Sequence, residues 1–407
     1  MKAFFTSAAI RVFGISNNLL LIFVSGRFLG IAGFGQLSAA LSIFMLVGFF
    51  LTAVETREIV RIIGASKLSE RWARWHLCKN VSFQNLVLLP VLLAIAIPCL
   101  IFESTRFFAP LVLALYFVRA SAVLSAIQRG LGAYIFGNSE GMLIRPIATL
   151  VSLLALSQFE IHAFSPLEIA TFSYFLGAVV GTLFLIFASR NLFSRPKGFA
   201  LPSLKIPKAN GLLLLSSIDA LLINYDIFVA SLIYPPEAVA ELRFGLQVKM
   251  LALLPVQVFL MYNMNRLAGI FIGKQTHFQE NIWASLKIMR FAAPVYVAFT
   301  YAFGLLAFHF VFQQTLSKTM LALLLTPALI TLLLGPITEF YVSSRLEKSI
   351  SRELKLLFAF YFLAIPVLAF LFKPVFIVYV AANSIVLSLF FIVLFAKFPL
   401  RSILSAK

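Results

Sequence analysis

Long apolar runs separated by short polar segments occupy the sequence from end to end. A helix rises about 1.5 Å per residue, so about 20 apolar residues cross the roughly 30 Å hydrocarbon core of a bilayer. The runs lack the period-two alternation of barrel strands, and lipid cannot satisfy unpaired backbone groups, so we expect helices. The fold class predicted is an all-α integral membrane protein with about 12 transmembrane helices. The predicted spans are residues 4–26, 36–56, 81–102, 107–128, 142–158, 168–189, 211–233, 243–266, 290–312, 319–340, 354–372 and 375–396.

The distribution of Lys and Arg predicts the orientation of these spans. An even number of spans puts both termini on one side of the membrane. Of the 33 Lys and Arg residues, 25 fall in one set of alternate loops and termini, five in the other set, and three inside spans. Because cytoplasmic loops carry the excess of Lys and Arg, we expect both termini to be cytoplasmic. The net charge of +18 therefore follows from topology and does not indicate a nucleic-acid partner.

The middle of the chain predicts a linker between two halves. Residues 191–210 hold three prolines, several cations and no long apolar run. We therefore expect an N-terminal six-helix lobe at 1–190, this cytoplasmic linker, and a C-terminal six-helix lobe at 211–407. When the second half of the sequence is aligned with the first at an offset of 205 residues, Ile233–Leu246 lies opposite Phe28–Leu41 and the turn residues of the two segments match. The halves would then form a parallel repeat, with a central cavity between the two lobes.

Composition excludes a soluble protein. The chain is 61% apolar and 12% charged, with a mean hydropathy of +1.00, against about 25% charged residues in soluble domains. The loops between the predicted spans are short and leave no room for an extramembrane enzyme domain. The sequence has no Walker A motif and no nucleophile elbow, and its four histidines and two cysteines are scattered. We therefore expect a transporter rather than an enzyme, with no cofactor and no metal.

Polar residues recur on one face of the first helix. Ser7, Arg11, Gly14, Asn18 and Ser25 are spaced by four, three, four and seven residues, which aligns them in one stripe. Such a stripe favours a hydrated cavity over lipid, so Arg11 and Asn18 are candidate substrate-binding residues. The alternative is that Arg11 snorkels to the cytoplasmic headgroups.

Four further charged residues fall inside predicted spans, where each needs a partner or a function. Arg119 lies mid-span with no acid on its own helix, and Lys249 lies about two turns from the outer end of its helix. Both are candidate substrate-binding residues; a buried ion pair or snorkelling is the alternative. Asp219 and Asp226 lie two turns apart on one helix face. Burial favours the protonated form of a carboxylic acid, so both are candidates for ion coupling, or else fixed partners of the cations.

Three segments carry a resemblance to a known family. The first helix ends in Gly26–Gly35, which is similar to an Arg-x-Leu-Gly-x-x-x-Phe-Gly hairpin. The second helix runs into a basic loop, Thr56–Arg61, and the seventh holds Asn224–Asp226 before a Pro-Pro-Glu turn. Together with twelve spans and cytoplasmic termini, these segments resemble bacterial polysaccharide flippases of the O-antigen type. That family belongs to the superfamily that includes the multidrug and toxin extrusion transporters.

The resemblance implies a substrate and a location. The substrate would be an oligosaccharide repeat unit on undecaprenyl pyrophosphate, flipped across the bacterial inner membrane by alternating access, in lipopolysaccharide biosynthesis. Implied partners are membrane lipids, a polysaccharide polymerase and a chain-length regulator. Two alternatives stay open at this point. One is a multidrug or small-solute antiporter of the same superfamily, and the other is an integral-membrane glycosyltransferase or polysaccharide polymerase.

Overall fold

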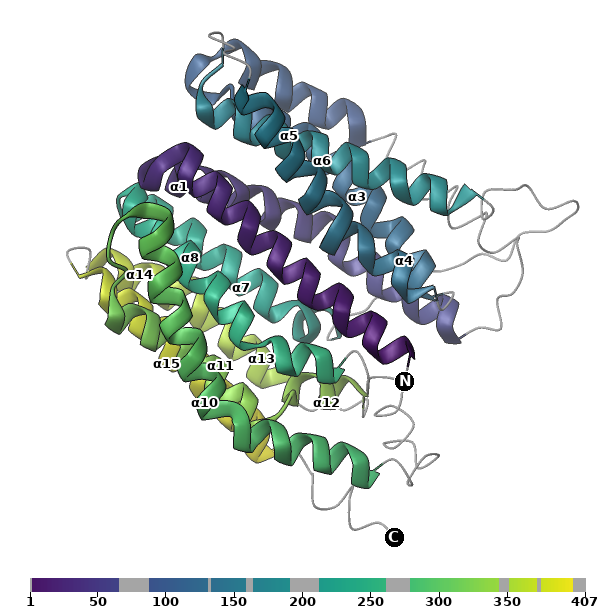
Figure 1. Cartoon of the computed structure of the whole chain (residues 1–407), viewed down its shortest axis with the longest axis vertical. Helices are drawn as coiled ribbons and strands as arrows, with labels where there is room; N and C mark the ends of the chain where they lie inside the picture. Colours follow the sequence, from purple (N-terminus) through teal and green to yellow (C-terminus); the bar gives the residue numbers. More distant parts are fainter. Residues whose placement is uncertain are drawn as a thin grey trace, which may run out of the picture. The chain divides into compact units, whose positions relative to one another are not determined.

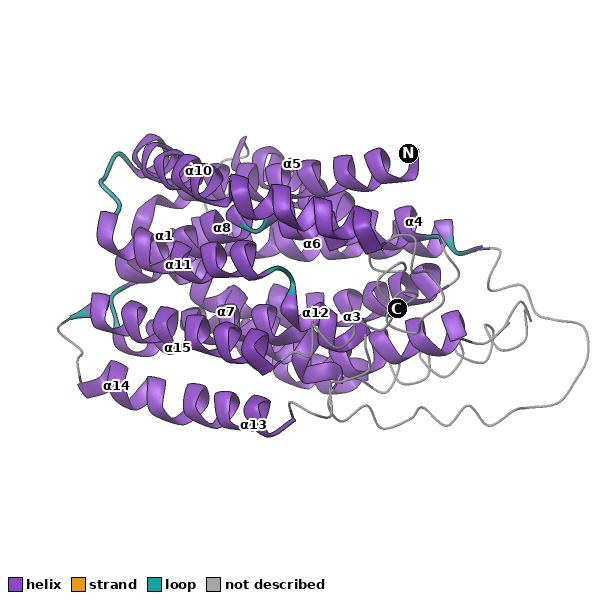
Figure 2. Cartoon of the chain, turned by 90° about the horizontal axis from the view of Figure 1, so that it is seen from below, coloured by secondary structure: helices purple, strands orange, loops and turns teal. Residues whose placement is uncertain are grey.

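The protein folds into helices grouped in two compact units. The structure is a computed structural model that describes residues 2–65, 88–130, 133–158, 164–190, 212–260, 279–343, 351–371 and 375–397. Those ranges contain no strand, so the all-α prediction is confirmed (Figure 2). The N-unit is Val12–Ala209, and the C-unit is Met1–Arg11 together with Asn210–Lys407. The division between the units therefore falls inside the first helix.

The described part of the N-unit runs from α1 to α6 (Figure 1). Its elements in chain order are α1 (Lys2–Ala65), the helix Leu88–Ile101, the 3₁₀ turn η1 (Glu103–Thr105), α3 (Phe108–Gly130), α4 (Tyr134–Ser139), the π-helical turn η2 (Glu140–Ile144), α5 (Arg145–Gln158) and α6 (Pro166–Ala188).

A sharp kink at Gly30 divides α1 into two helices. Gly30 has φ 68° and ψ 178°, a backbone region that glycine alone tolerates readily. The kink falls within the segment that the sequence predicts as a turn. The prediction of a loop directly after the second span is wrong, because α1 continues through Thr56–Arg61 to Ala65. No helix-breaking residue occurs there before Gly64, so the polar residues extend the helix.

Substituting Gly30 tests this kink. Gly30→Ala should lower the free energy of unfolding by about 1–3 kcal/mol, because the backbone conformation is strained for any residue with a Cβ. A Cβ at Gly30 would meet no atom within 4 Å, so the loss would be purely conformational. Thermal unfolding in detergent measures the change in stability. Gly48→Ala is the control, because Gly48 is helical and its added Cβ would meet only the flexible end of the Leu115 side chain. An unchanged midpoint for Gly30→Ala would contradict the kink.

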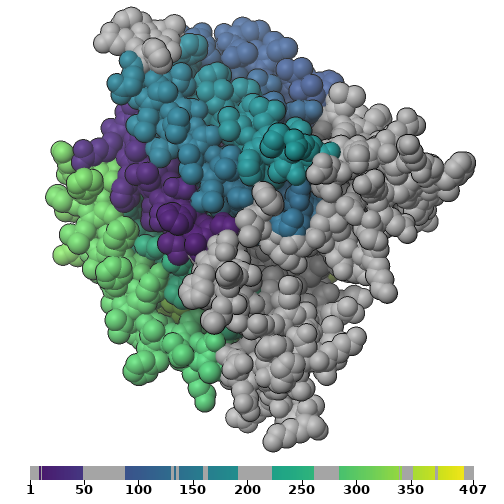
Figure 3. All heavy atoms as spheres, turned by 45° about the vertical axis from the view of Figure 1, so that its right-hand side comes forward, coloured from purple at the N-terminus to yellow at the C-terminus, as the bar shows by residue number. Residues whose placement is uncertain are grey.

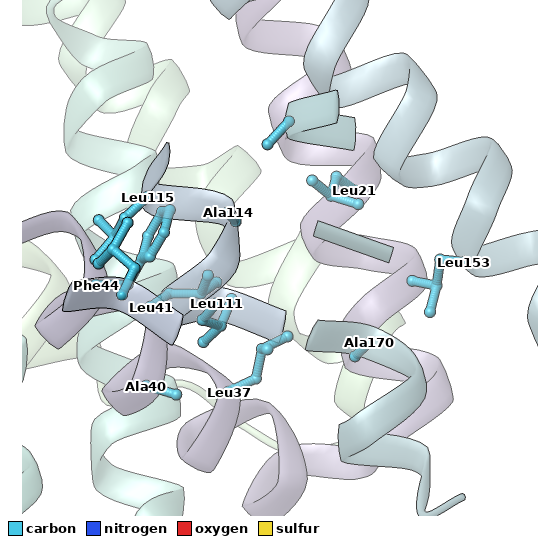
Figure 4. Packing of buried hydrophobic residues seen from close by; sticks show 12 residues of the cluster. Leu21, Leu37, Ala40, Leu41, Phe44, Leu111, Ala114, Leu115, Leu153 and Ala170 are labelled. Carbon is cyan, nitrogen blue, oxygen red and sulfur yellow. The ribbon is translucent and has the colours of Figure 1, made fainter. Parts of the chain in front are cut away.

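The hydrophobic core of the N-unit joins both arms of α1 to four other helices. Leu21 precedes the kink, whereas Leu37 and Phe44 follow it, and all three belong to one buried cluster (Figure 4). The remaining members are Ala40 and Leu41 on α1, Leu92 on the helix Leu88–Ile101, Leu111, Ala114 and Leu115 on α3, Leu153 on α5, and Ala170 and Ala178 on α6. The two arms of α1 therefore pack into the same core, which fixes the fold around Gly30.

The C-unit contains three interrupted helices. Its elements are α7 (Leu212–Ile233), α8 (Pro236–Ala252), the helix Leu254–Leu260, α10 (Gln279–Phe312), α11 (Lys318–Leu334), α12 (Ile337–Ser343), α13 (Ser351–Ala359), the π-helical turn η6 (Phe360–Ala364), α14 (Ile365–Leu371) and α15 (Phe376–Lys397). The chain bends by 47° between α8 and the helix that follows. It breaks again at Gly335, where φ is 92°, and η6 interrupts the α-helical path from α13 to α14.

The fifth predicted span is longer than the sequence indicates. The sequence predicts its start at residue 142, but helical structure runs without a break from Tyr134 to Gln158. Arg145 therefore lies inside the candidate span Gly137–Gln158. The physical reason is that Glu140 forms an ion pair with Arg145, which lets the charged segment continue as helix.

Several described helices have the length and composition of membrane spans. Seven described helices are long and apolar enough to cross a membrane, or eight if α8 and the bent helix after it form one span. Three shorter apolar helices are also present among the described residues. Helix α10, in the green region of Figure 3, exposes an apolar face on which Ile288, Phe291, Val295 and Phe299 are 65–91% exposed. Water disfavours such a face and lipid does not. The chain is thus a multi-pass membrane protein; twelve spans and cytoplasmic termini stay predictions.

Candidate functional site

A buried carboxylate forms the centre of a polar cluster in the C-unit. Asp226 on α7 is 4% exposed. Its Oδ1 accepts a hydrogen bond from the Tyr361 hydroxyl at 2.6 Å and another from Asn383 Nδ2 at 3.1 Å. The Tyr379 hydroxyl donates to the backbone carbonyl of Asp226 at 2.8 Å. A carboxylate inside an apolar helix bundle is costly, and these donors offset part of that cost.

Local helix geometry brings the donors to Asp226. Tyr379 and Asn383 are four residues apart on α15, so their side chains lie on the same helix face. Tyr361 lies in the π-helical turn η6, a distortion that often marks functional positions in helices. The adjacent Tyr225 donates to the carbonyl of Phe362 in the same turn, which ties α7 to η6 at two consecutive residues.

A buried lysine accompanies this carboxylate. Lys249 lies in the last turn of α8, and its charge acts attractively on Asp226. A cation is favoured at a helix C-terminus, where carbonyl dipoles point outward. The bend follows at Leu253, and the Tyr296 hydroxyl donates to the freed carbonyl of Leu251 at 2.9 Å. Interrupted helices of this kind provide ion and substrate sites in transporters.

The cluster retains capacity for a further ligand. Asn383 is almost fully buried, and no group in the described part of the chain donates a hydrogen bond to its Oδ1. An amide oxygen next to a carboxylate suits a proton donor or a hard cation such as Na⁺. The described ranges hold no group of three His, Cys, Asp or Glu residues that would bind a transition metal. The Asp226 carboxylate and the Asn383 Oδ1 are the oxygen ligands that a small cation would use here.

The residues predicted from sequence are distributed over both units. Asp226 and Lys249 both lie in the C-unit, where the charge of Lys249 acts on Asp226. In the N-unit, Arg119 is half-buried in the middle of α3, and Asn18 is exposed on α1. The side chains of Arg11 and Asp219 lie outside the described part of the structure. All six assignments therefore stay predictions, although Asp226 has the contacts that a coupling residue needs.

Sequence reasoning missed the three donors around Asp226. Tyr361, Tyr379 and Asn383 lie more than 130 residues from Asp226 in sequence. The only local signal is the four-residue spacing of Tyr379 and Asn383 within an otherwise apolar run.

Apolar helices in two units, with charged groups buried among them, define a multi-pass membrane protein. No protein-family model and no curated protein matches the chain. Solved structures do match over its whole length. One is MATE in complex with MaL6, with TM-score 0.66, 16% identity, and coverage of 100% of this chain and 97% of that chain.

Two further structures extend the comparison. The lipid II flippase MurJ in its inward closed conformation matches with TM-score 0.66 and 14% identity, over 97% of this chain and 88% of that chain. A MOP superfamily transporter from Pyrococcus furiosus, described as having a binding pocket of reverse polarity, matches with TM-score 0.65 and 16% identity, over 100% and 97%. The chain therefore has a MATE-like fold; membership of the superfamily suggested by the sequence stays a prediction.

Proposed function

We propose that the protein is a flippase that moves undecaprenyl-pyrophosphate-linked oligosaccharide repeat units across the bacterial inner membrane. The substrate would be an O-antigen or a similar surface polysaccharide. The two units would alternate access to a central cavity, while the polyprenyl tail remains in lipid. A pyrophosphate bearing sugars cannot cross hydrocarbon unaided, so the path needs cations that offset its desolvation. A polysaccharide polymerase and a chain-length regulator would act on the product.

The observation that carries this proposal is the position of Arg119. It lies in the middle of α3, a candidate membrane span of 22 residues, and it is not fully buried. A guanidinium at this depth costs at least about 2.5–3.5 kcal/mol, so it is expected to face the protein interior or water. Arg119 suits an anionic substrate, and the fold shared with a lipid II flippase supports a lipid-linked one. Arg11, Asn18 and Lys249 would add further contacts.

A multidrug or small-solute antiporter is the second candidate. It is favoured by the structural match to MATE transporters, among them a multidrug resistance MATE family transporter in its inward-facing conformation, with TM-score 0.64 and 17% identity over 98% of this chain and 99% of that chain. A cationic drug would need acids in its path. Efflux of cationic dyes from cells that express the protein tests this candidate directly.

Complementation separates the two candidates. The wild-type chain should restore surface polysaccharide in a strain that lacks its own O-antigen flippase, with lipid-linked repeat units appearing on the outer side of the membrane. A well-expressed protein that fails to restore translocation but exports cationic dyes would replace the flippase with the antiporter.

Removing the mid-span cation should abolish this complementation. Arg119→Ala is expected to reduce translocation of the repeat unit by about tenfold or more, because a charge-assisted phosphate contact is lost. Arg106→Ala is the control, since Arg106 lies at a loop and is exposed. Full surface polysaccharide from a normally expressed Arg119→Ala variant would reject the cationic path.

A further inference from the structure

The N-unit contains a buried ion pair inside a candidate membrane span. Arg145 Nε lies 2.9 Å from Glu140 Oε1, and Arg145 Nη2 donates to Glu140 Oε2 at 3.0 Å. Both carboxylate oxygens therefore meet the same guanidinium. The Nη2 contact is a charge-assisted hydrogen bond and the Nε contact is an ion-pair contact, and together they hold the two side chains against each other.

The surrounding helices are shaped to hold this pair. The π-helical turn η2 runs from Glu140, and the Arg145 amide donates to the Glu140 carbonyl, which places residues five apart on one face. A Cβ on Gly181 of α6 would lie only 2.7 Å from Glu140 Oε1, and one on Gly177 would lie 2.0 Å from Thr149 Oγ1. The two glycines of α6, four residues apart, thus allow the close approach of α5 and η2.

The two partners differ in what they present to a ligand. The Glu140 side chain is 3% exposed, whereas the Arg145 side chain is 24% exposed. Within the described residues, Glu140 is the only group that accepts a hydrogen bond from the Arg145 side chain. An arginine side chain has five N–H donors and only one of them is engaged in this hydrogen bond, so the guanidinium keeps donors for a further acceptor.

The accessible side of Arg145 does not face the lipid-exposed stripe of its own helix. Ile147, Val151 and Leu154 form the exposed apolar stripe of α5, and Arg145 lies on the other side of the helix. Gly141 is exposed next to the guanidinium, and a Cβ there would lie 3.2 Å from Arg145 Nη2. The absence of a side chain at Gly141 leaves the guanidinium open to an incoming group.

We propose that Arg145 binds a phosphate-bearing group, with Glu140 as the residue that positions it. The ligand is an anion because the carboxylate is enclosed and the guanidinium is the accessible partner. The planar guanidinium fork matches two phosphate oxygens, which a lysine cannot reproduce. The inference rests on the proposed function in naming the ligand as the pyrophosphate of the lipid-linked substrate. The headgroup of an ordinary anionic phospholipid shares the same chemistry.

Binding by the purified full-length protein tests the site without transport. The probe is radiolabelled farnesyl pyrophosphate, offered to protein in phosphatidylcholine nanodiscs. Arg145→Gln should weaken binding by about tenfold or more, and Arg145→Lys should fall between it and the wild type. The matched control is Arg106→Gln, which removes an exposed arginine that lies 3.8 Å from Glu168 and should leave binding unchanged.

A double variant covers the case in which Arg145→Gln does not fold because Glu140 is left unpaired. Glu140→Gln with Arg145→Gln removes both charges and should fold, yet bind the probe as weakly as Arg145→Gln. Wild-type affinity in the double variant would overturn the proposal. Adding phosphatidylglycerol to the nanodiscs should leave probe binding unchanged; competition would assign the site to a phospholipid headgroup and overturn the substrate assignment.

Failure of the inference and failure of the proposed function give different results. Complementation by the wild type together with Arg145-independent probe binding would reject the site and keep the flippase. Arg145-dependent binding without complementation would keep the phosphate site and reject the flippase.

Discussion

Glu140→Ala should lower the free energy of unfolding by about 1.5–3 kcal/mol, because the partly exposed Arg145 guanidinium loses its counter-charge and a charge-assisted hydrogen bond. The two contacts of 2.9 and 3.0 Å are lost together. A smaller contribution comes from the space that opens against Gly181, where the carboxylate packs. Thermal or denaturant unfolding in detergent measures the change.

Two further variants identify the cause of that loss. Arg106→Ala breaks an ion pair whose arginine is exposed, and it should cost less than about 1 kcal/mol. Glu140→Leu combined with Arg145→Met removes both charges and should recover most of the stability, because uncharged side chains of similar size need no counter-charge. If the double variant is no more stable than Glu140→Ala, the loss comes from packing rather than from an unpaired charge.

The sequence could predict helices, but not the pairs of side chains that helix packing brings together. The length of the apolar runs predicts the bounds of α3, α6 and α15 within a few residues, because a run of about 20 apolar residues is typical of a transmembrane helix. The turn near Gly30 is also predicted, since glycine and the charged Arg27 interrupt the run. These features depend on neighbours in sequence, and local composition is enough to find them.

The Glu140–Arg145 pair shows where local reasoning fails. On a regular α-helix, residues five apart point in directions about 140° apart. A comparison of residues three and four apart, which share a helix face, therefore does not find this pair. The π-helical turn η2 alters that geometry and aligns them. The sequence identifies Asp226 as an acid within an apolar run, but its partners on η6 and α15 follow only from tertiary packing.

The Glu140–Arg145 pair of the N-unit and the Asp226 cluster of the C-unit share one structural feature. In each unit a π-helical turn carries a buried polar side chain: Glu140 in η2 and Tyr361 in η6. The first side chain meets an arginine within its own helix, and the second meets Asp226 on another helix. We infer that the N-unit pair provides a fixed charge for an anionic substrate, whereas the C-unit cluster is suited to exchange a cation.

Asp226→Asn should abolish the response of transport to an ion gradient while the protein remains folded. The asparagine oxygen can still accept from Tyr361 and Asn383, so the hydrogen bonds at 2.6 and 3.1 Å keep an acceptor, but the exchangeable charge is gone. Proteoliposomes that contain a lipid-linked oligosaccharide, with a proton or a Na⁺ gradient imposed in turn, measure the response. The wild-type rate should rise with one of the two gradients, and the Asp226→Asn rate with neither.

The Tyr361 hydroxyl, which donates a hydrogen bond to the Asp226 carboxylate, allows a second test of the same site. Tyr361→Phe removes a donor to a charged acceptor and should cost about 1.5–3 kcal/mol of stability, with a weakened gradient response. Tyr234→Phe is the matched control, because its hydroxyl donates to the Ala369 carbonyl at 3.4 Å and has no hydrogen bond to the carboxylate. A gradient response in Asp226→Asn equal to that of the wild type would show that coupling occurs elsewhere. Asp226 would then be a fixed counter-charge for Lys249, held by Tyr361 and Asn383 for stability alone.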